Sequence, residues 1–265
     1  MKIIACGDSF TSGDEVIDDL LYSDFPGYTK LSYDNCEVRY KWHLATKGPR
    51  SRRYATIIPR EQLLSYPAQL SQILRCDVAN LGNGGASQIQ IGDSLIRGIV
   101  AEQKAGTKMS ELIVTINFTS PNRFMVPIYH KWASIILGHI IPAIHNKEYQ
   151  AYERLYTLNT TEIMLYEAHA MAILQSVSYL RSLNIKYVLV DSVFGDDIMK
   201  FVDGDDSSDL LRGCWKQILE GNEILSMKKV AEDRDIQDVW CPGNHFSKYV
   251  HYEFAKALAD RLTKL

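Results

Sequence analysis

The stretch KIIACGDSFTSG at residues 2–13 joins an apolar, β-branched run to a turn rich in glycine and serine. The run Lys2–Cys6 predicts a buried strand, because short apolar runs that end at glycine are typical of strands inside a sheet. The turn after it carries Ser9, preceded by Gly7 and Asp8. In open α/β folds, ligands bind beyond the carboxyl ends of the strands, and a turn there lifts a side chain above that edge. We therefore expect Ser9 to lie at the functional edge of a sheet.

The rest of the chain alternates between strand-like and helix-like segments. Further buried strands are predicted at three apolar runs, residues 77–81, 111–116 and 186–190. Helical periodicity is found at residues 65–74, 88–102, 160–183 and 247–265. For the longest helix, Asn159 is the predicted N-cap, three residues before Glu162, and Asn184 marks the end. This alternation predicts an α/β fold built on a parallel sheet.

Length and composition indicate one enzyme-sized unit. The 265 residues, of which 46% are hydrophobic, suit a single domain over residues 1–265 with a substantial core. Two stretches, at about residues 14–62 and 124–157, contain no convincing strand–helix unit. We expect these stretches to be insertions around the site, because long irregular connections are often functional.

Charge and cysteine usage exclude several classes of protein. The formal net charge of −3 argues against a nucleic-acid partner held by the overall field. The apolar start Met1–Cys6 is too short for a signal peptide core or a membrane span, so we expect a cytoplasmic protein without a membrane partner. The five cysteines include no C-x-x-C pair and predict reduced thiols. The acidic run 203–209 lacks the pattern of a calcium loop and is interpreted as a solvated acidic loop. The glycines at 82–85 lack the pattern of a nucleotide site, so we expect no metal and no cofactor.

Ser9 and His245 are the candidates for nucleophilic chemistry. A serine hydroxyl is a poor nucleophile until a base removes its proton, so a reactive Ser9 requires a histidine elsewhere in the chain. His245 stands in the loop CPGNHFS at residues 241–247, just before the last predicted helix. The alternative roles are a helix N-cap for Ser9 and a surface-loop histidine for His245.

Three motifs, taken in order, resemble the sequence blocks of the SGNH/GDSL hydrolases. The first is GDSF at residues 7–10, and the second is NLGNGGAS at residues 80–87. In the third, His251 and Ala255 follow His245 by six and ten residues, which is similar to the last family block, His-Pro-x-x-x-Gly-His-x-x-x-Ala. Together the three motifs span nearly the whole chain.

This resemblance implies a three-layer, flavodoxin-like fold and a serine hydrolase. It implies Ser9 as nucleophile, His245 as base, and an oxyanion hole that includes the backbone N–H groups of Ser9 and Gly85. The family's third block, Gly-x-Asn-Asp, is replaced here by INFTSPNR at residues 116–123. Thr119 takes the place of the asparagine, and the Thr-Ser-Pro-x-Arg version resembles a variant of phage-encoded members. Thr119, Asn117 and Asn122 therefore compete as the side-chain donor of the hole.

The acid that orients the histidine is missing from its family position. The family aspartate stands three residues before the histidine, where this chain has Pro242. Asp238 and Asp235 are the nearest upstream carboxylates, and a main-chain carbonyl is the alternative group that would orient His245 in a Ser-His dyad. We favour the carbonyl.

The expected substrate is a small O-ester, such as an acylated sugar. Asp8, Arg123, Arg52 and Arg53 are candidate substrate-binding residues, although Asp8 is better suited to supporting the turn. Arg52 and Arg53 belong to the basic segment 39–60, which is either a solvated flap or a lid for an anionic substrate. A basic lid would suit a phosphomonoesterase, and the absent aspartate would suit an inactive binding protein with the same fold. The oligomeric state is left open.

Overall fold

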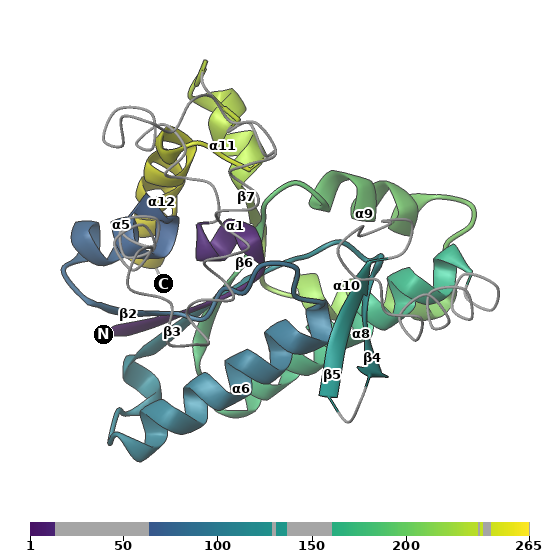
Figure 1. Cartoon of the computed structure of the whole chain (residues 1–265), viewed down its shortest axis with the longest axis horizontal. Coiled ribbons are helices and arrows are strands. Elements are labelled where there is room, and N and C mark those ends of the chain that lie inside the picture. Colours follow the sequence, from purple (N-terminus) through teal and green to yellow (C-terminus); the bar gives the residue numbers. More distant parts are fainter. Residues whose placement is uncertain (14–63, 129–130, 137–160, 238, 241–244, 265) are drawn as a thin grey trace.

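The computed structural model describes residues 1–13, 64–128, 131–136, 161–237, 239–240 and 245–264 (Figure 1). Its centre is a sheet of five parallel strands. The strands are β1 (Lys2–Cys6), β2 (Asp77–Asn80), β3 (Leu112–Asn117), β6 (Lys186–Asp191) and β7 (Ile224–Ser226). Their spatial order is β2-β1-β3-β6-β7, which is the flavodoxin-like doubly wound order. The predicted α/β fold with a parallel sheet is confirmed.

Helices cover both faces of this sheet (Figure 1). One face packs against α6 (Gln88–Lys104), α8 (Glu162–Ser182), α9 (Gly195–Asp203) and α10 (Asp209–Leu219). The other face packs against α5 (Tyr66–Leu74), α11 (Met227–Asp233) and α12 (Lys248–Leu262). Neighbouring strand residues alternate between the two cores: Ile3 lies on the α12 side, and Ile4 lies on the α6 side. Burial on both faces explains why these strands appear as continuous apolar runs in the sequence.

The predicted boundaries differ from the observed ones by a few residues. The N-cap of α8 is Thr161, so the prediction of Asn159 was wrong, whereas Asn184 does follow the helix in a left-handed conformation with φ 52°. Ser65 and Ser247, which the predicted helices included, are the N-caps of α5 and α12. Each displaced boundary falls at a residue that favours a cap over a helix interior.

The second predicted insertion contains regular structure. An antiparallel hairpin of β4 (Arg123–Ile128) and β5 (Lys131–Ile136) follows the central strand β3, and β4 packs beside α6. The first predicted insertion, about 14–62, lies outside the described residues. The hairpin matters for the site because its first residue is Arg123.

Two other features of the described part bear on the predictions. None of its helices has both the length and the apolar character needed to cross a bilayer. Within the same residues, no three histidine, cysteine or acidic side chains lie together as metal ligands would.

Candidate active site

Ser9 begins the short helix α1 (Ser9–Ser12) directly beyond the carboxyl end of β1. The side chain of Asp8 caps this helix, because its Oδ1 accepts a hydrogen bond of 3.1 Å from the backbone N–H of Phe10. Gly13 ends the helix with φ 82°, and its N–H donates to the carbonyl of Ser9. The N–H of Ser9 stands at the helix start, where it has no partner within the helix. The turn thus presents both a hydroxyl and a backbone donor at the sheet edge.

The loop that follows β2 is bound to this turn. The N–H of Asn83 donates to the carbonyl of Gly7 over 3.0 Å. Gly82 permits the approach, because a Cβ at that position would lie 2.3 Å from the backbone nitrogen of Ser12. Gly85, two residues past Asn83, has φ 75°, a left-handed conformation that favours glycine. The structure thereby brings the loop that carries Gly85 against the turn that carries Ser9.

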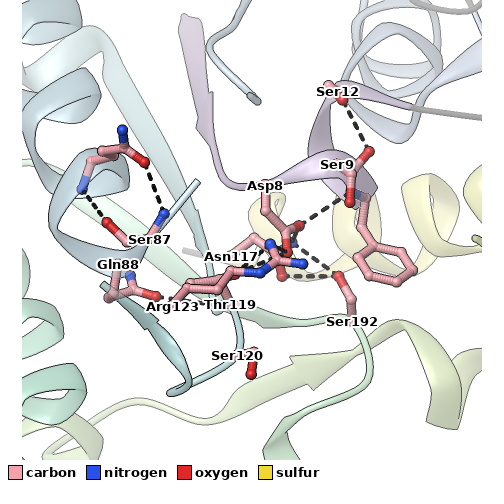
Figure 2. Close-up of polar contacts among 12 residues, drawn as sticks. Asp8, Ser9, Ser12, Ser87, Gln88, Asn117, Thr119, Ser120, Arg123 and Ser192 are labelled. Carbon is pink, nitrogen blue, oxygen red and sulfur yellow. Dashed lines mark hydrogen bonds and ion pairs between the residues drawn. The ribbon is translucent and has the colours of Figure 1, made fainter. Parts of the chain in front are cut away.

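Asp8 is the centre of a buried hydrogen-bond cluster (Figure 2). Its Oδ1 accepts from the side-chain nitrogen of Asn117 over 3.3 Å, in addition to the N–H of Phe10. Its Oδ2 accepts from the Thr119 hydroxyl over 3.1 Å and from Nη1 of Arg123 over 3.0 Å. The Asp8 side chain has no exposed surface. Asp8 therefore joins the turn that carries Ser9 to the end of β3 and to the start of the hairpin.

Burial and neighbouring charges shift the pKa of the Asp8 carboxyl in opposite directions. Desolvation raises the pKa of its carboxyl, while the neighbouring charge of Arg123 and the hydrogen bonds from Phe10 and Thr119 lower the pKa. Burial has the larger effect, so the pKa of the Asp8 carboxyl is raised on balance, although the donated hydrogen bonds and the charge of Arg123 oppose this shift. The Arg123 side chain is 14% exposed, so the ion pair with Asp8 is largely shielded from solvent.

The candidate donors of the third block are already engaged. The Asn117 amide nitrogen donates both to Asp8 and, over 2.9 Å, to the Ser192 hydroxyl. The Thr119 hydroxyl donates its one proton to Asp8 and accepts from Arg123 over 2.8 Å. Asn122, the third candidate, is exposed, and its N–H donates to the Ser120 hydroxyl. In this arrangement neither Asn117 nor Thr119 has a side-chain donor left.

Two residues of this hydrogen-bond cluster, Gln88 and Ser192, were not predicted from the sequence. Gln88, the first residue of α6, accepts from the N–H of Thr119 over 3.2 Å, and Ser192 follows β6 and bonds to Asn117 (Figure 2). The position of Gln88 could have been predicted from the sequence, because Ser87 and Gln90 form a capping box that places a helix start there. No sequence pattern identifies Ser192, since its hydrogen bond to Asn117 depends on β6 lying beside β3.

His245 contacts the turn that carries Ser9 through an aromatic ring. Its ring centroid lies 4.9 Å from that of Phe10, the residue after Ser9. Phe10 in turn contacts Phe246 at 5.4 Å, and Phe246 stacks on Trp240 at 4.6 Å. An antiparallel β-bridge also joins Trp240 to Phe246. Residues far apart in the sequence, Ser9 and His245, are therefore brought to the same edge of the sheet.

His251, the second histidine of the last motif, is buried in the protein core. His251 is fully buried in α12, and its Nδ1 accepts a hydrogen bond of 3.0 Å from the N–H of Tyr66 at the start of α5. Burial, together with the nearby His245, lowers the pKa of His251 to about 3. His251 therefore stays neutral at physiological pH and ties α12 to α5.

This environment predicts a loss of stability in mild acid. The pKa of His251 is about 3 in the folded protein and 6.5 in the unfolded chain. Below about pH 6.5 the unfolded chain therefore binds more protons than the folded protein, so the free energy of unfolding falls as the pH drops. The contribution of His251 is about 2 kcal/mol between pH 8 and pH 5. His169, whose pKa burial lowers to about 4, acts in the same direction.

Urea unfolding of the wild type and of His251→Asn at pH 8 and pH 5 measures this contribution. The asparagine oxygen can accept from Tyr66 but does not titrate, so the variant should lose about 2 kcal/mol less on acidification. Equal losses in the two proteins would show that His251 is not the titrating group.

The remaining predicted site residues differ in where they lie. Asp238, Arg52 and Arg53 lie outside the described residues, as does the whole basic segment 39–60. Asp235 is exposed beyond the end of α11, where its carboxylate accepts from the side chain of Gln237. Asp8, a candidate for substrate binding, is sealed inside the cluster, and Arg123 is its partner.

Comparison with known proteins gave matches among solved structures only. No protein-family model matches the sequence, and neither does any curated protein. A G-D-S-L family protein from Desulfitobacterium hafniense is similar over 98% of both chains, with 14% identity and a TM-score of 0.46. A member of the lipolytic G-D-S-L family from Veillonella parvula is similar over 100% of both chains, with 12% identity and a TM-score of 0.43.

An acetyl xylan esterase from the rumen bacterium Butyrivibrio proteoclasticus is also similar. It has 13% identity and a TM-score of 0.49 over 99% of this chain. The present chain covers 63% of that esterase.

Proposed function

We propose that the protein is a serine hydrolase that cleaves O-esters, with Ser9 as nucleophile and His245 as base. The observation that carries the proposal is the contact of the His245 ring with Phe10, 4.9 Å between centroids, directly beside Ser9. The position of Ser9 supports it, since the turn beyond β1 places this serine at the ligand-binding edge of the sheet. The sequence motifs that resemble the SGNH/GDSL blocks point to the same pair.

In the proposed reaction, His245 removes the hydroxyl proton as Ser9 Oγ bonds to the ester carbonyl carbon. The carbonyl electron pair moves to the oxygen, which the backbone N–H groups of Ser9 and Gly85 would stabilise. Protonated His245 then gives its proton to the leaving alcohol, and water hydrolyses the acyl-enzyme by the same steps. The left-handed conformation of Gly85 supports this role of its N–H, because no atom of the described residues lies within 4 Å of where a Cβ would be.

A panel of acetyl esters, longer acyl esters and phosphate monoesters tests the reaction type. We expect turnover of acyl esters, including acylated sugars, by the wild type and none by Ser9→Ala. Turnover of phosphate esters alone would favour the phosphomonoesterase alternative, and no turnover of either class would favour a binding protein.

The group that orients His245 is tested by Asp238→Asn. We propose a Ser-His dyad oriented by a main-chain carbonyl, so this variant should keep a near-native rate, whereas His245→Ala should lose most activity. Steady-state rates of both variants decide the question. A loss in Asp238→Asn on the order of 10⁴-fold would instead identify Asp238 as the acid of a triad.

A further inference from the structure

We propose that Arg123 supplies the third oxyanion donor, in place of the side chain of Thr119. This inference rests on the proposed ester hydrolysis at Ser9 and deepens it by assigning a charged residue to the transition state. The first reason is the engagement of the neutral candidates. The one proton of the Thr119 hydroxyl and the amide of Asn117 are both directed at Asp8 or Ser192, so neither can turn to a substrate without breaking a buried bond.

The second reason is the reach of the Arg123 side chain. Its Nη1 lies 2.8 Å from Thr119 Oγ1 and 3.0 Å from Asp8 Oδ2, which places the guanidinium at the tip of the Thr119 side chain and next to the nucleophile turn (Figure 2). The guanidinium of Arg123 therefore lies directly beside Thr119, the residue that stands in the place of the family's asparagine.

The third reason is that the guanidinium has unused donors. A guanidinium carries five N–H groups in a fixed fork, and the bonds to Asp8 and Thr119 use only Nη1. Nε of Arg123 is buried and has no hydrogen-bond partner in the described part of the chain. Because the side chain is 14% exposed, the group is not sealed from an incoming substrate. Asp8 holds the fork in place before the substrate arrives.

The chemical role follows from the charge that develops in the reaction. When Ser9 Oγ bonds to the carbonyl carbon, the carbonyl electron pair moves to the oxygen and the serine proton moves to His245. Arg123 donates a hydrogen bond to that oxygen and transfers no proton. A fixed cation in a shielded site stabilises the oxyanion more than the neutral carbonyl, so its effect should fall on kcat rather than on KM.

The test compares Arg123→Ala with Arg97→Ala, an exposed arginine paired with Asp93 on α6. We expect Arg123→Ala to lower kcat roughly 10²- to 10³-fold with little change in KM. The affinity for phenylboronic acid, which forms a tetrahedral anion on a reactive serine, should fall by a similar factor. Added guanidinium at millimolar level should restore part of the rate. Arg97→Ala should show none of these effects.

Arg123→Lys covers the case in which the alanine variant does not fold, since it keeps a charge opposite Asp8. A single ammonium cannot reproduce the planar fork, so kcat should still fall roughly tenfold or more while the fold is retained. A folded Arg123 variant with normal kcat and boronate affinity overturns the inference. So does a lower kcat with unchanged boronate affinity and no rescue, because those results indicate a positioning role alone. A wild type that neither hydrolyses esters nor reacts with a fluorophosphonate overturns the proposed function, and this inference with it.

Discussion

Ser9→Ala is expected to lower ester turnover roughly 10⁴- to 10⁶-fold, because losing the nucleophile of a serine hydrolase removes the covalent route altogether. The fold should survive, since only a small hydroxyl is lost and the cap of α1 comes from Asp8. The measurement is kcat/KM on an acetyl ester, with circular dichroism as the check on folding.

Ser12→Ala is the matched control for this prediction. Ser12 lies on the same short helix, and its hydroxyl donates to the carbonyl of Ser9 over 3.0 Å. Its loss should change the rate by less than about tenfold, because a single neutral hydrogen bond contributes about 1 kcal/mol. Similar rates for Ser9→Ala and the wild type would remove Ser9 from the mechanism.

Asp8→Asn is expected to destabilise the protein by about 3–5 kcal/mol, because it leaves the charge of Arg123 shielded from water without a partner. Asparagine keeps only one acceptor oxygen, so its NH2 group would face donors either at the Oδ2 position or at the Oδ1 position. Urea unfolding monitored by fluorescence gives the change in the free energy of unfolding by linear extrapolation.

Asp93→Asn serves as the control, since it breaks an aspartate–arginine pair of 2.7 Å on the exposed face of α6. That pair is solvated, so its loss should have no measurable effect on stability. If Asp8→Asn proved as stable as Asp93→Asn, the buried cluster would not be the stabilising feature that its geometry indicates.

Much of the fold could be predicted because the core strands are apolar runs buried on both faces. β7 was missed, since its three residues, Ile224–Ser226, are too few to form such a run. The helices α9 and α10 were missed because they flank the acidic residues 203–209, which were interpreted as a solvated loop. The cap of α8 was misplaced because Asn159 and Thr161 are both cap-forming residues, and local sequence does not choose between them.

The candidate site combines residues that local sequence motifs identify with residues that only the folded chain brings together. Ser9 and His245 stand in recognisable motifs, so they could be proposed from the sequence. The pairing of Asp8 with Arg123 joins residues 115 positions apart. It arises because β1 pairs with β3, whose end leads to Thr119 and the hairpin. Such contacts depend on sheet register, which periodicity does not reveal.

The central claim is that Ser9 is an activated nucleophile served by His245. Its most direct test is to treat the wild type with a fluorophosphonate and to locate the adduct by peptide mass spectrometry. We predict one adduct on the peptide that contains Ser9, absent from Ser9→Ala and strongly slowed in His245→Ala, because the reagent reacts only with serines whose proton a base removes. An unlabelled wild type, or an adduct on another serine that persists in Ser9→Ala, would contradict the account.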